Sequence, residues 1–387
     1  MYLTVKDIKQ TYKPITNVID SLFAGETEII IPNFTENKLV RTKTYKVDSV
    51  NSEVITFEQF LLFTALVNAT KADHPNPEDE YISFRIPKKT HGFREINAPK
   101  PELKSAQKEI ANALQNYLHI LSHDSAWAYV EGRDVVNAMK EHTNNKSRWY
   151  LKLDLHDFFG SCNKEFIISQ LKKIYPFADT EHFGAECINE TLNSLTDVAI
   201  LNGGLPQGTP LSPILTNLIM VDIDYRINKL LYKLTKDNKL FKQKYIYTRY
   251  ADDIIISAKN KFEYAEIVKA INDLLEDTPL ELNNEKTRFG SNSGRNWNLG
   301  IMCNSQFKTT VGYRRKHALK SYVHNYLSNR AEGNLTELDD LYWLQGQLSW
   351  LQNVEPEYFN GFIEYINKKY NTNLIKDIIL DIKSFNN

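Results

Sequence analysis

Two adjacent carboxylates interrupt an otherwise apolar stretch of the sequence. Asp252 and Asp253 follow Tyr250-Ala251 and precede three isoleucines, a pattern that predicts a tight turn between two buried strands. Two ionised carboxylates side by side repel each other and are costly to bury without a positive charge. A divalent cation would supply that charge. A solvent-exposed Asp-Asp turn is the alternative interpretation of the same pattern.

A third carboxylate lies upstream, at the end of another predicted strand. The segment Trp149–Asp154 alternates apolar and polar residues, as a half-buried strand does. Placed beside Asp252 and Asp253, Asp154 would complete a site for two Mg²⁺ ions, with Mn²⁺ as a substitute. Two such ions can clamp the attacking hydroxyl and the leaving pyrophosphate in a single displacement. Capping of the next helix is the alternative role for Asp154.

The rest of the chain must supply the elements that position these carboxylates. The sequence predicts a hairpin over Tyr81–Pro99 that turns at His91-Gly92, and a loop over Ala72–Glu80. Apolar periodicity predicts helices over Val54–Val67, Glu102–Leu121, Cys162–Ile174, Asp222–Leu234, Phe262–Leu275, Arg314–Arg330, Asn334–Leu351, Pro356–Tyr370 and Leu374–Lys383. The fold class is therefore α+β, with a helical C-terminal part.

Charge and composition restrict the class of partner. The 47 basic and 48 acidic residues nearly cancel, so the chain has no overall positive field to attract nucleic acid. The segment Lys286–Lys320 nevertheless contains eight basic residues and no acidic one. Such segregation suits contacts with a phosphate backbone, and a solvated surface is the alternative. Three scattered cysteines, an N-terminus without a signal-peptide pattern and no apolar run of membrane-spanning length predict a cytoplasmic protein.

Five segments of the sequence occur in a characteristic order: Arg85–Pro99, Leu153–Phe159, Gly204–Pro213 followed by Asn217, Tyr250–Asp253 and Asn283–Arg288. In these segments, and from about residue 80 to about residue 350, the chain resembles prokaryotic reverse transcriptases. The resemblance implies a right-hand polymerase with fingers, an antiparallel palm sheet and a helical thumb. It divides the chain into a mostly helical N-terminal extension (1–80), fingers (81–150), a palm with inserted fingers helices (151–300), and a primer grip with a helical thumb (301–387).

The resemblance also implies a role for each site residue. Asp154, Asp252 and Asp253 would bind the metals, and Lys286 would protonate the departing pyrophosphate. The bulk of Phe159 would exclude a 2′-hydroxyl and thereby favour deoxynucleotides. For Phe159 and Lys286 the alternatives are a core aromatic residue and a surface lysine.

Further residues would contact the template and the incoming nucleotide. The family touches both at the positions of Gln207 and Gly208, where a glycine permits close backbone approach. Lys88 or Lys89, together with Arg94, matches the basic fingers residues that hold the triphosphate.

Departures from the retron pattern point towards another group of reverse transcriptases. Retron enzymes usually carry the motifs Asn-Ala-x-x-His and Val-Thr-Gly. In place of the first motif this chain has Asn137–His142, which is one residue longer, and in place of the second it has Thr310-Val311-Gly312. The residues Gly160–Cys162 also differ from the usual Pro-Ser-Ile. The segments Asn296–Gly300 and Gly312–Lys316 look most like those of bacterial defence-associated, abortive-infection-type enzymes.

That group implies antiphage defence through DNA synthesis. The implied partners are dNTPs, a structured non-coding RNA as template, the DNA product, and a companion protein or a second copy of the chain. The chain ends before the maturase and endonuclease domains of group II intron enzymes would be expected. Three alternatives stay open: retron-type msDNA synthesis, template-independent or protein-primed DNA synthesis by the same site, and a maturase-like protein that binds RNA without catalysis.

Overall fold

The computed structural model describes residues 55–87, 92–118, 122–237, 243–292, 296–298 and 300–385. The chain divides into two compact units, and each unit is assembled from segments that are distant in the sequence. The first unit comprises Met1–Asp124, His156–Ile227 and Leu274–Glu281, and the second comprises Ser125–Leu155, Asn228–Asp273 and Leu282–Asn387. Residues 1–54 of the proposed N-terminal extension lie outside the described residues.

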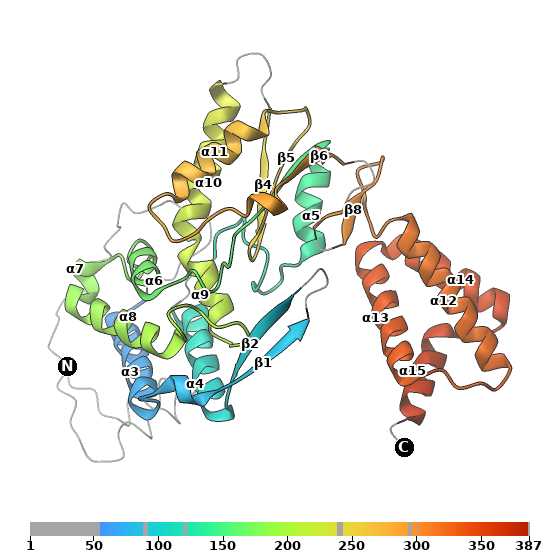
Figure 1. The fold of residues 1–387 in the computed structure, drawn as a ribbon, viewed down its shortest axis with the longest axis horizontal. Coiled ribbons are helices and arrows are strands. Elements are labelled where there is room, and N and C mark those ends of the chain that lie inside the picture. Colours follow the sequence, from blue (N-terminus) through green and yellow to red (C-terminus); the bar gives the residue numbers. More distant parts are fainter. Residues whose placement is uncertain are drawn as a thin grey trace. The chain divides into compact units, whose positions relative to one another are not determined.

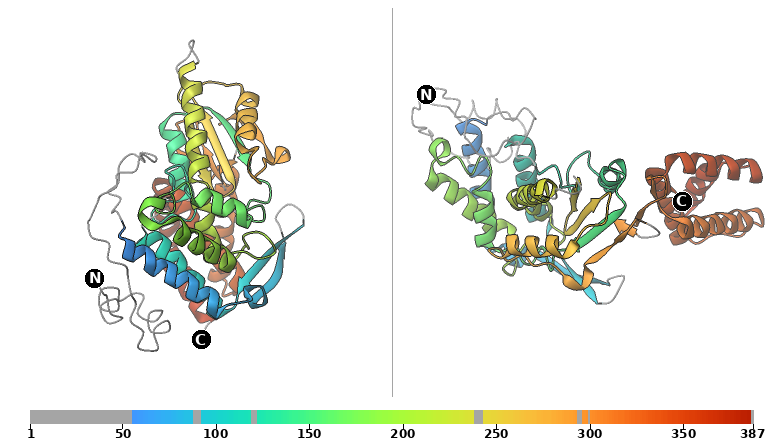
Figure 2. Two further views of the ribbon diagram at one scale, coloured as in Figure 1. Left: turned by 90° about the vertical axis from the view of Figure 1, so that its left-hand side faces the viewer. Right: turned by 90° about the horizontal axis from the view of Figure 1, so that it is seen from above.

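The first unit is mainly helical and carries one β-hairpin (Figure 1). Its helical segments are α3 (Phe57–Asp73), η2 (Pro77–Glu80), α4 (Pro101–Asn112), η3 (Ala113–Tyr117), α6 (Lys164–Leu171), α7 (Thr180–Phe183), α8 (Ala185–Ala199), α9 (Ser212–Ile219) and the first turns of α10 (Val221–Asp237). Helices α3 and α8 lie side by side (Figure 2). The buried rings of Phe60 and Phe63 on α3 both contact the buried ring of Phe177.

Several helix boundaries differ from the predicted ones for local reasons. Helix α3 begins after Thr56, because Thr56 and Gln59 form a reciprocal capping box, and it continues to Asp73 into the predicted loop. The predicted helix Glu102–Leu121 is α-helical only to Asn112, because a π-turn follows it. Helix α6 begins at Lys164, after the side chain of Asn163 caps it.

The hairpin of the first unit is formed as predicted. Strands β1 (Tyr81–Pro87) and β2 (Phe93–Pro99) pair antiparallel, with Phe84 opposite Ile96. The two strands pair with each other and with no other described strand. The predicted turn residue His91 lies outside the described residues, as do Lys88 and Lys89.

The second unit is built around a four-stranded sheet, which is antiparallel as the resemblance implies. In spatial order its strands are β4 (Ile246–Tyr250), β5 (Asp253–Ala258), β3 (Trp149–Asp154) and β6 (Arg288–Ser291). The register places Asp154 opposite Asp253 at one end of the sheet and Trp149 opposite Ala258 at the other end. Helix α11 (Tyr264–Leu275) meets the sheet where Tyr264 stacks on Phe289.

A smaller sheet and four helices complete the second unit. The sheet consists of β7 (Asn296–Asn298), β8 (Ile301–Cys303) and β9 (Thr309–Thr310), and the short turn η4 (Asn284–Lys286) precedes β6. The helices, coloured orange to red in Figure 1, are α12 (Tyr313–Ala331), α13 (Leu338–Val354), α14 (Pro356–Tyr370) and α15 (Leu374–Ser384). The predicted helical C-terminal part is thus present, and α14 has the predicted bounds.

One hydrophobic core joins these helices to the main sheet. It runs from α5 (Val135–Asn144) through Tyr150 and Ile255 to residues of α12–α15 such as Leu348 and Ile366. Polar contacts add to it, because Tyr326 and Arg330 of α12 both bond to Asp381 of α15. Among the described helices, none combines the length and apolar character that crossing a membrane requires.

Candidate active site

The backbone of the second unit brings the three predicted carboxylates to one end of the main sheet. Asp154 ends β3, Asp253 begins β5 directly opposite it, and the N–H of Leu155 donates to the carbonyl of Asp252 at 3.1 Å. Neighbouring antiparallel strands lie about 5 Å apart. The order of the sheet therefore gathers residues that are about one hundred positions apart in the sequence.

The turn that presents Asp252 and Asp253 has an unfavourable backbone conformation. Ala251, the first of its two central residues, has a φ of 56°, and a side chain in this left-handed region costs about 1–2 kcal/mol. Arg249, which is fully buried, donates a hydrogen bond from Nη1 to the carbonyl of Ala251 at 3.2 Å. We infer that this contact holds the strained turn. No pattern in the sequence distinguishes Arg249 from an ordinary strand residue.

Two ammonium groups contact the carboxylates. The Nζ of Lys286 lies 2.8 Å from Oδ1 of Asp154, and the Nζ of Lys152 lies 2.8 Å from Oδ2 of Asp253. Lys152 was missed by the sequence analysis. It stands two residues before Asp154, so strand alternation places both side chains on one face of β3, and that signal could have found it.

Asp252 is the carboxylate with the least favourable surroundings. Burial raises its pKa above the ordinary value, and the neighbouring charges of Asp253 and Asp154 raise it further, while Lys286 opposes the increase. The protein therefore compensates this negative charge poorly. A cation at this position would lower the free energy of the ionised form.

The donor set consists of carboxylate oxygens, which are the ligands that hard divalent cations prefer. Within the residues that the structure describes, no three His, Cys, Asp or Glu side chains converge closely enough to hold a metal ion by themselves. Mg²⁺ is commonly held by one or two carboxylates together with substrate phosphates and water. Asp252, Asp253 and Asp154 offer oxygen ligands of this kind, and Lys152 and Lys286 already place positive charge against two of them.

The first unit gathers a second group of predicted site residues around the loop that contains Pro206-Gln207-Gly208, called the Pro-Gln-Gly loop below. The carbonyl of Gln207 accepts a hydrogen bond from the N–H of Asn97 on β2 at 2.8 Å. Gly208 has a φ of 111°, and a methyl group there would lie 2.8 Å from Cγ2 of Ile96. Arg94 is exposed and stands two residues before Ile96, so it projects from the same face of β2. The loop thus packs on the strand that carries Arg94.

Phe159 is tied to the same loop through its main chain. Its carbonyl accepts a hydrogen bond from the N–H of Leu205 at 3.0 Å, and its half-buried ring meets the buried ring of Phe158 edge-on. The next residue, Gly160, touches Gly204 so closely that a methyl group on Gly204 would lie 2.3 Å from the Gly160 carbonyl oxygen. This backbone contact joins the first carboxylate segment to the Pro-Gln-Gly segment.

The structure therefore collects the predicted residues in two groups. Within the second unit lie Asp154, Asp252, Asp253 and Lys286. Within the first unit lie Arg94, Phe159, Gln207 and Gly208. Lys88 and Lys89 fall outside the described residues.

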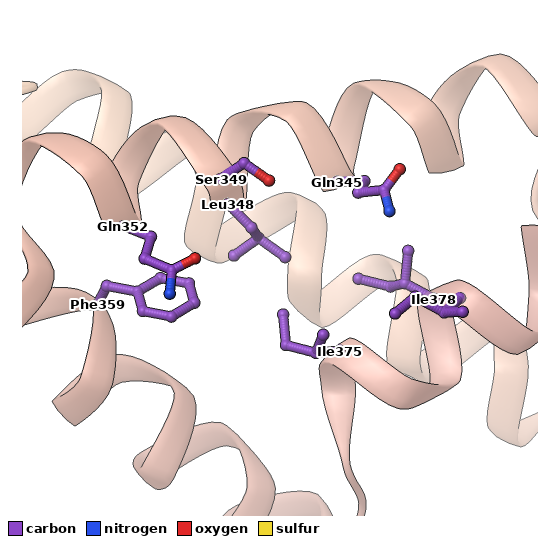
Figure 3. Close-up of a pocket in the computed structure, with 8 residues that line it drawn as sticks. Gln345, Leu348, Ser349, Gln352, Phe359, Ile375 and Ile378 are labelled. Atoms are coloured by element: carbon purple, nitrogen blue, oxygen red, sulfur yellow. The ribbon is translucent and has the colours of Figure 1, made fainter. Parts of the chain in front are cut away.

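A cavity of about 200 Å³ lies elsewhere, among α13, α14 and α15 (Figure 3). Its lining combines apolar side chains such as Leu348, Phe359 and Ile378 with the amides of Gln345 and Gln352. No titratable side chain lines this cavity. It therefore offers no acid, base or charged metal ligand, in contrast to the end of the main sheet.

Comparison with protein families identifies the class to which this arrangement belongs. The family model described as "Reverse transcriptase (RNA-dependent DNA polymerase)" matches residues 86–321, more than half of the chain. The chain belongs to the reverse transcriptase family. The prediction of an RNA-directed DNA polymerase is thereby confirmed, and membership implies an RNA template, dNTP substrates and a general dependence on divalent metal ions.

Curated relatives of this reverse transcriptase include several retron enzymes. It is 28% identical over 336 residues to the retron Ec83 reverse transcriptase of Escherichia coli, covering 85% of this chain and 97% of that protein. It is 27% identical to the Ec73 enzyme of E. coli, over 74% of this chain and 85% of that protein. It is 26% identical to the Mx162 enzyme of Myxococcus xanthus, over 76% and 61%. These bacterial relatives confirm the prokaryotic type and place this reverse transcriptase close to retrons.

Solved structures similar to this reverse transcriptase include telomerases. A C-terminally truncated apo telomerase from Candida tropicalis aligns at a TM-score of 0.41 and 14% identity, over 65% of this chain and 60% of that one. A Candida albicans telomerase bound to a telomeric RNA fragment aligns at 0.41 and 14%, over 78% and 59%. The reverse transcriptase thus spans about three fifths of each telomerase chain.

The segment that departs from the retron Asn-Ala-x-x-His pattern contacts both strands of the hairpin that carries Asp252 and Asp253. His142 is fully buried and contacts Thr248 on β4 at 2.8 Å and Ser257 on β5 at 2.6 Å. Burial lowers the pKa of His142 to about 3, so the imidazole is neutral. In this reverse transcriptase, therefore, His142 joins the two strands that lead into and out of the Asp252-Asp253 turn.

Proposed function

We propose that the protein is a Mg²⁺-dependent reverse transcriptase that polymerises dNTPs on an RNA template through Asp154, Asp252 and Asp253. The observation that carries the proposal is the register of β3 and β5, which sets Asp154 against Asp253 beside the half-buried Asp252. When bound, two divalent cations would stabilise the charge that develops on the attacking and leaving oxygens. The three carboxylates would hold these cations.

Lys286 is proposed to serve the leaving group. Its ammonium lies 2.8 Å from Asp154, and its side chain is 59% exposed, so it can reach solvent-filled space beside the carboxylates. A cation at this position can stabilise or protonate departing pyrophosphate. Lys152 has a different role in the proposal, because it is less exposed and lies against Asp253, where it fixes that carboxylate.

The residues around the Pro-Gln-Gly loop are proposed to bind the nucleotide. Arg94, with Lys88 or Lys89, would pair with the triphosphate, since guanidinium and ammonium groups form charge-assisted hydrogen bonds with phosphate. Gln207 and Gly208 would contact the template and the base. Phe159 would lie against the sugar and exclude a 2′-hydroxyl. Support comes from the hydrogen bond between Gln207 and Asn97, which fixes the loop on the strand that carries Arg94.

Helix α12 is proposed to contact the nucleic-acid backbone. It contains no acidic residue, and Arg314, His317 and Lys320 on its first two turns are exposed. Not all of the basic segment Lys286–Lys320 is available for this purpose. Lys308 and Lys316 pair with Glu357 and Glu355, while Arg295 lies outside the described residues.

The biological setting in our proposal is bacterial antiphage defence in the cytoplasm, with a structured non-coding RNA as template. The resemblance of Asn296–Gly300 and Gly312–Lys316 to defence-associated enzymes supports it. Retron-type msDNA synthesis is the second candidate, favoured by the similarity to the Ec83 and Ec73 retron enzymes. Sequencing the nucleic acid that co-purifies with the protein, and the DNA it makes, separates these two from template-independent or protein-primed synthesis.

One double variant tests the catalytic proposal. We expect Asp252→Ala/Asp253→Ala to abolish dNTP incorporation on an RNA template with Mg²⁺ or Mn²⁺, because both metal positions lose ligands. The matched control is Asp339→Ala/Asp340→Ala, an exposed adjacent pair on α13, which should retain activity. Undiminished incorporation by a folded Asp252→Ala/Asp253→Ala enzyme would sink the proposal. RNA binding by the wild type without incorporation on any template would favour a maturase-like role instead.

A further inference from the structure

The main sheet carries a basic and aromatic surface at the end opposite to the carboxylates. Trp149 begins β3, Ala258 ends β5 and Ser291 ends β6, and the register places all three at this end. Asp154 lies five residues along β3 from Trp149, which corresponds to about 17 Å at ~3.4 Å per residue. Alternation also turns the side chains of Trp149 and Asp154 to opposite faces of the strand.

Five exposed basic side chains come from the loops at this end. They are Lys146, Arg148, Lys244, Lys259 and Lys261. Within the described part of the chain, none of the five forms an ion pair. The described residues of these loops (144–149, 243–246 and 258–264) contain one acidic residue, Glu263, and Glu266 follows on α11. The surface therefore carries a net positive charge although the whole chain does not.

Aromatic rings form a stack beside these cations. The ring of Trp149 stacks on Phe289 at 5.5 Å with an interplanar angle of 23°, and Phe289 stacks on Tyr264 at 4.7 Å and 20°. The Nζ of Lys261 lies 5.6 Å from the centre of the Trp149 ring. Tyr264, at the other end of the stack, is 41% exposed. A partly exposed ring that ends an ordered stack can accept one more flat ring.

We propose that this distal surface, defined by the five basic residues with Trp149 and Tyr264, binds a single-stranded segment of RNA outside the polymerase site. Exposed cations suit phosphates, and an aromatic face suits an unpaired base, which is the combination that single-stranded nucleic acids require. A duplex would not offer an unpaired base to Tyr264. The choice of RNA over DNA rests on the proposed function, since the template of that reaction is RNA.

The lysines and the ring are tested separately. Binding of a 30-nucleotide unstructured RNA is measured against salt concentration for the wild type and for Lys259→Gln/Lys261→Gln. Each phosphate contact with a single strand contributes about 0.7 to the slope of log K against log salt, so the slope should fall by about 1.4. The matched control is Lys104→Gln/Lys108→Gln, two exposed lysines of α4, which should keep the wild-type slope.

Tyr264→Ala should raise the Kd for the same RNA at least about fivefold, and Tyr264→Phe should restore binding because it retains the ring. All variants should extend a primer normally on a short template that does not reach beyond the catalytic site. An unchanged slope, equal binding by Tyr264→Ala and wild type, or tighter binding of a DNA of the same sequence would overturn the inference. Loss of extension by wild type as well would instead count against the proposed function.

Discussion

The contact between Gly160 and Gly204 yields a prediction about nucleotide selection. A methyl group on Gly204 would lie 2.3 Å from the carbonyl oxygen of Gly160 and 2.9 Å from its Cα, whereas ordinary contacts begin near 3.4 Å. The difference requires a retreat of about 1.1 Å. Because the obstructing atoms belong to the main chain, Gly204→Ala must displace the backbone that follows Phe159.

The displacement of the main chain should also move the ring of Phe159, which the proposed function places against the sugar. Phe159 is held by the hydrogen bond from the N–H of Leu205 to its carbonyl, which lies next to the disturbed contact. A misplacement of about 1 Å can change reaction rates about a hundredfold. We expect Gly204→Ala to reduce the selectivity for dNTPs over rNTPs by about tenfold or more. The strain should also lower the free energy of unfolding by about 1–3 kcal/mol.

The assay is single-nucleotide primer extension on an RNA template, with kcat/KM determined for a dNTP and for the matching rNTP. Two glycine variants serve as controls. In Gly160→Ala the new methyl group meets the end of the exposed Asp157 side chain, which can rotate away, and in Gly203→Ala it meets nothing within 4 Å although φ is 83°. Both controls should keep the wild-type selectivity. Phe159→Ala should lose the selectivity for dNTPs over rNTPs, and it serves as the reference for complete loss.

Two outcomes would refute different parts of this reasoning. A folded Gly204→Ala enzyme with wild-type selectivity would show that the glycine contact does not position Phe159. If Phe159→Ala itself retained full selectivity, the proposed contact between Phe159 and the sugar would be wrong, and the glycine contact would be purely structural. Thermal unfolding of each variant separates these outcomes from simple loss of the fold.

Three further predictions concern stability. Asp252→Asn should abolish primer extension. At neutral pH in EDTA it should nevertheless raise the free energy of unfolding by about 0.5–2 kcal/mol, because the raised pKa of Asp252 means that its ionised form opposes folding. A lower stability of Asp252→Asn in urea unfolding would contradict this prediction. The pKa of His142 is lowered to about 3 in the folded protein, so the unfolded chain binds the proton first as pH falls below about 6.5. Towards acid, the stability of the wild type should therefore decline by up to about 1.4 kcal/mol per pH unit more steeply than that of His142→Gln. Parallel curves of unfolding free energy against pH for the two proteins would exclude a neutral buried imidazole. Glu355 accepts hydrogen bonds from the hydroxyl of Thr310 and the N–H of Val311, and it forms an ion pair with Lys316. Glu355→Ala should therefore lower the free energy of unfolding in urea by about 1–3 kcal/mol. Additive effects in a double-mutant cycle with Lys316→Gln would argue against the ion pair.

The sequence was most informative where chemistry and local pattern coincide. Alternation over Trp149–Asp154 and the apolar residues around Asp252-Asp253 predicted two strands with carboxylates at their ends, and the register of β3 and β5 agrees. The predicted hairpin and the helical C-terminal part are also present, because both depend on short-range periodicity. Helix boundaries were less accurate, since caps such as Asn163 and the π-turn Ala113–Tyr117 are set by single hydrogen bonds.

Contacts between distant residues could not be read from the sequence. In the sequence, Arg249 is indistinguishable from an ordinary strand residue, and its hydrogen bond to the carbonyl of Ala251 exists only in the folded chain. Similarly, Lys152 forms its ion pair with Asp253 only because β5 places Asp253 beside it. The touching glycines 160 and 204 and the stack of Trp149, Phe289 and Tyr264 likewise depend on backbones that meet through the core. Residue types and spacing thus determined which groups are available for chemistry. Tertiary packing decided which of them share a dielectric environment, a hydrogen bond or a van der Waals contact, because these interactions act over a few ångströms of space rather than along the chain.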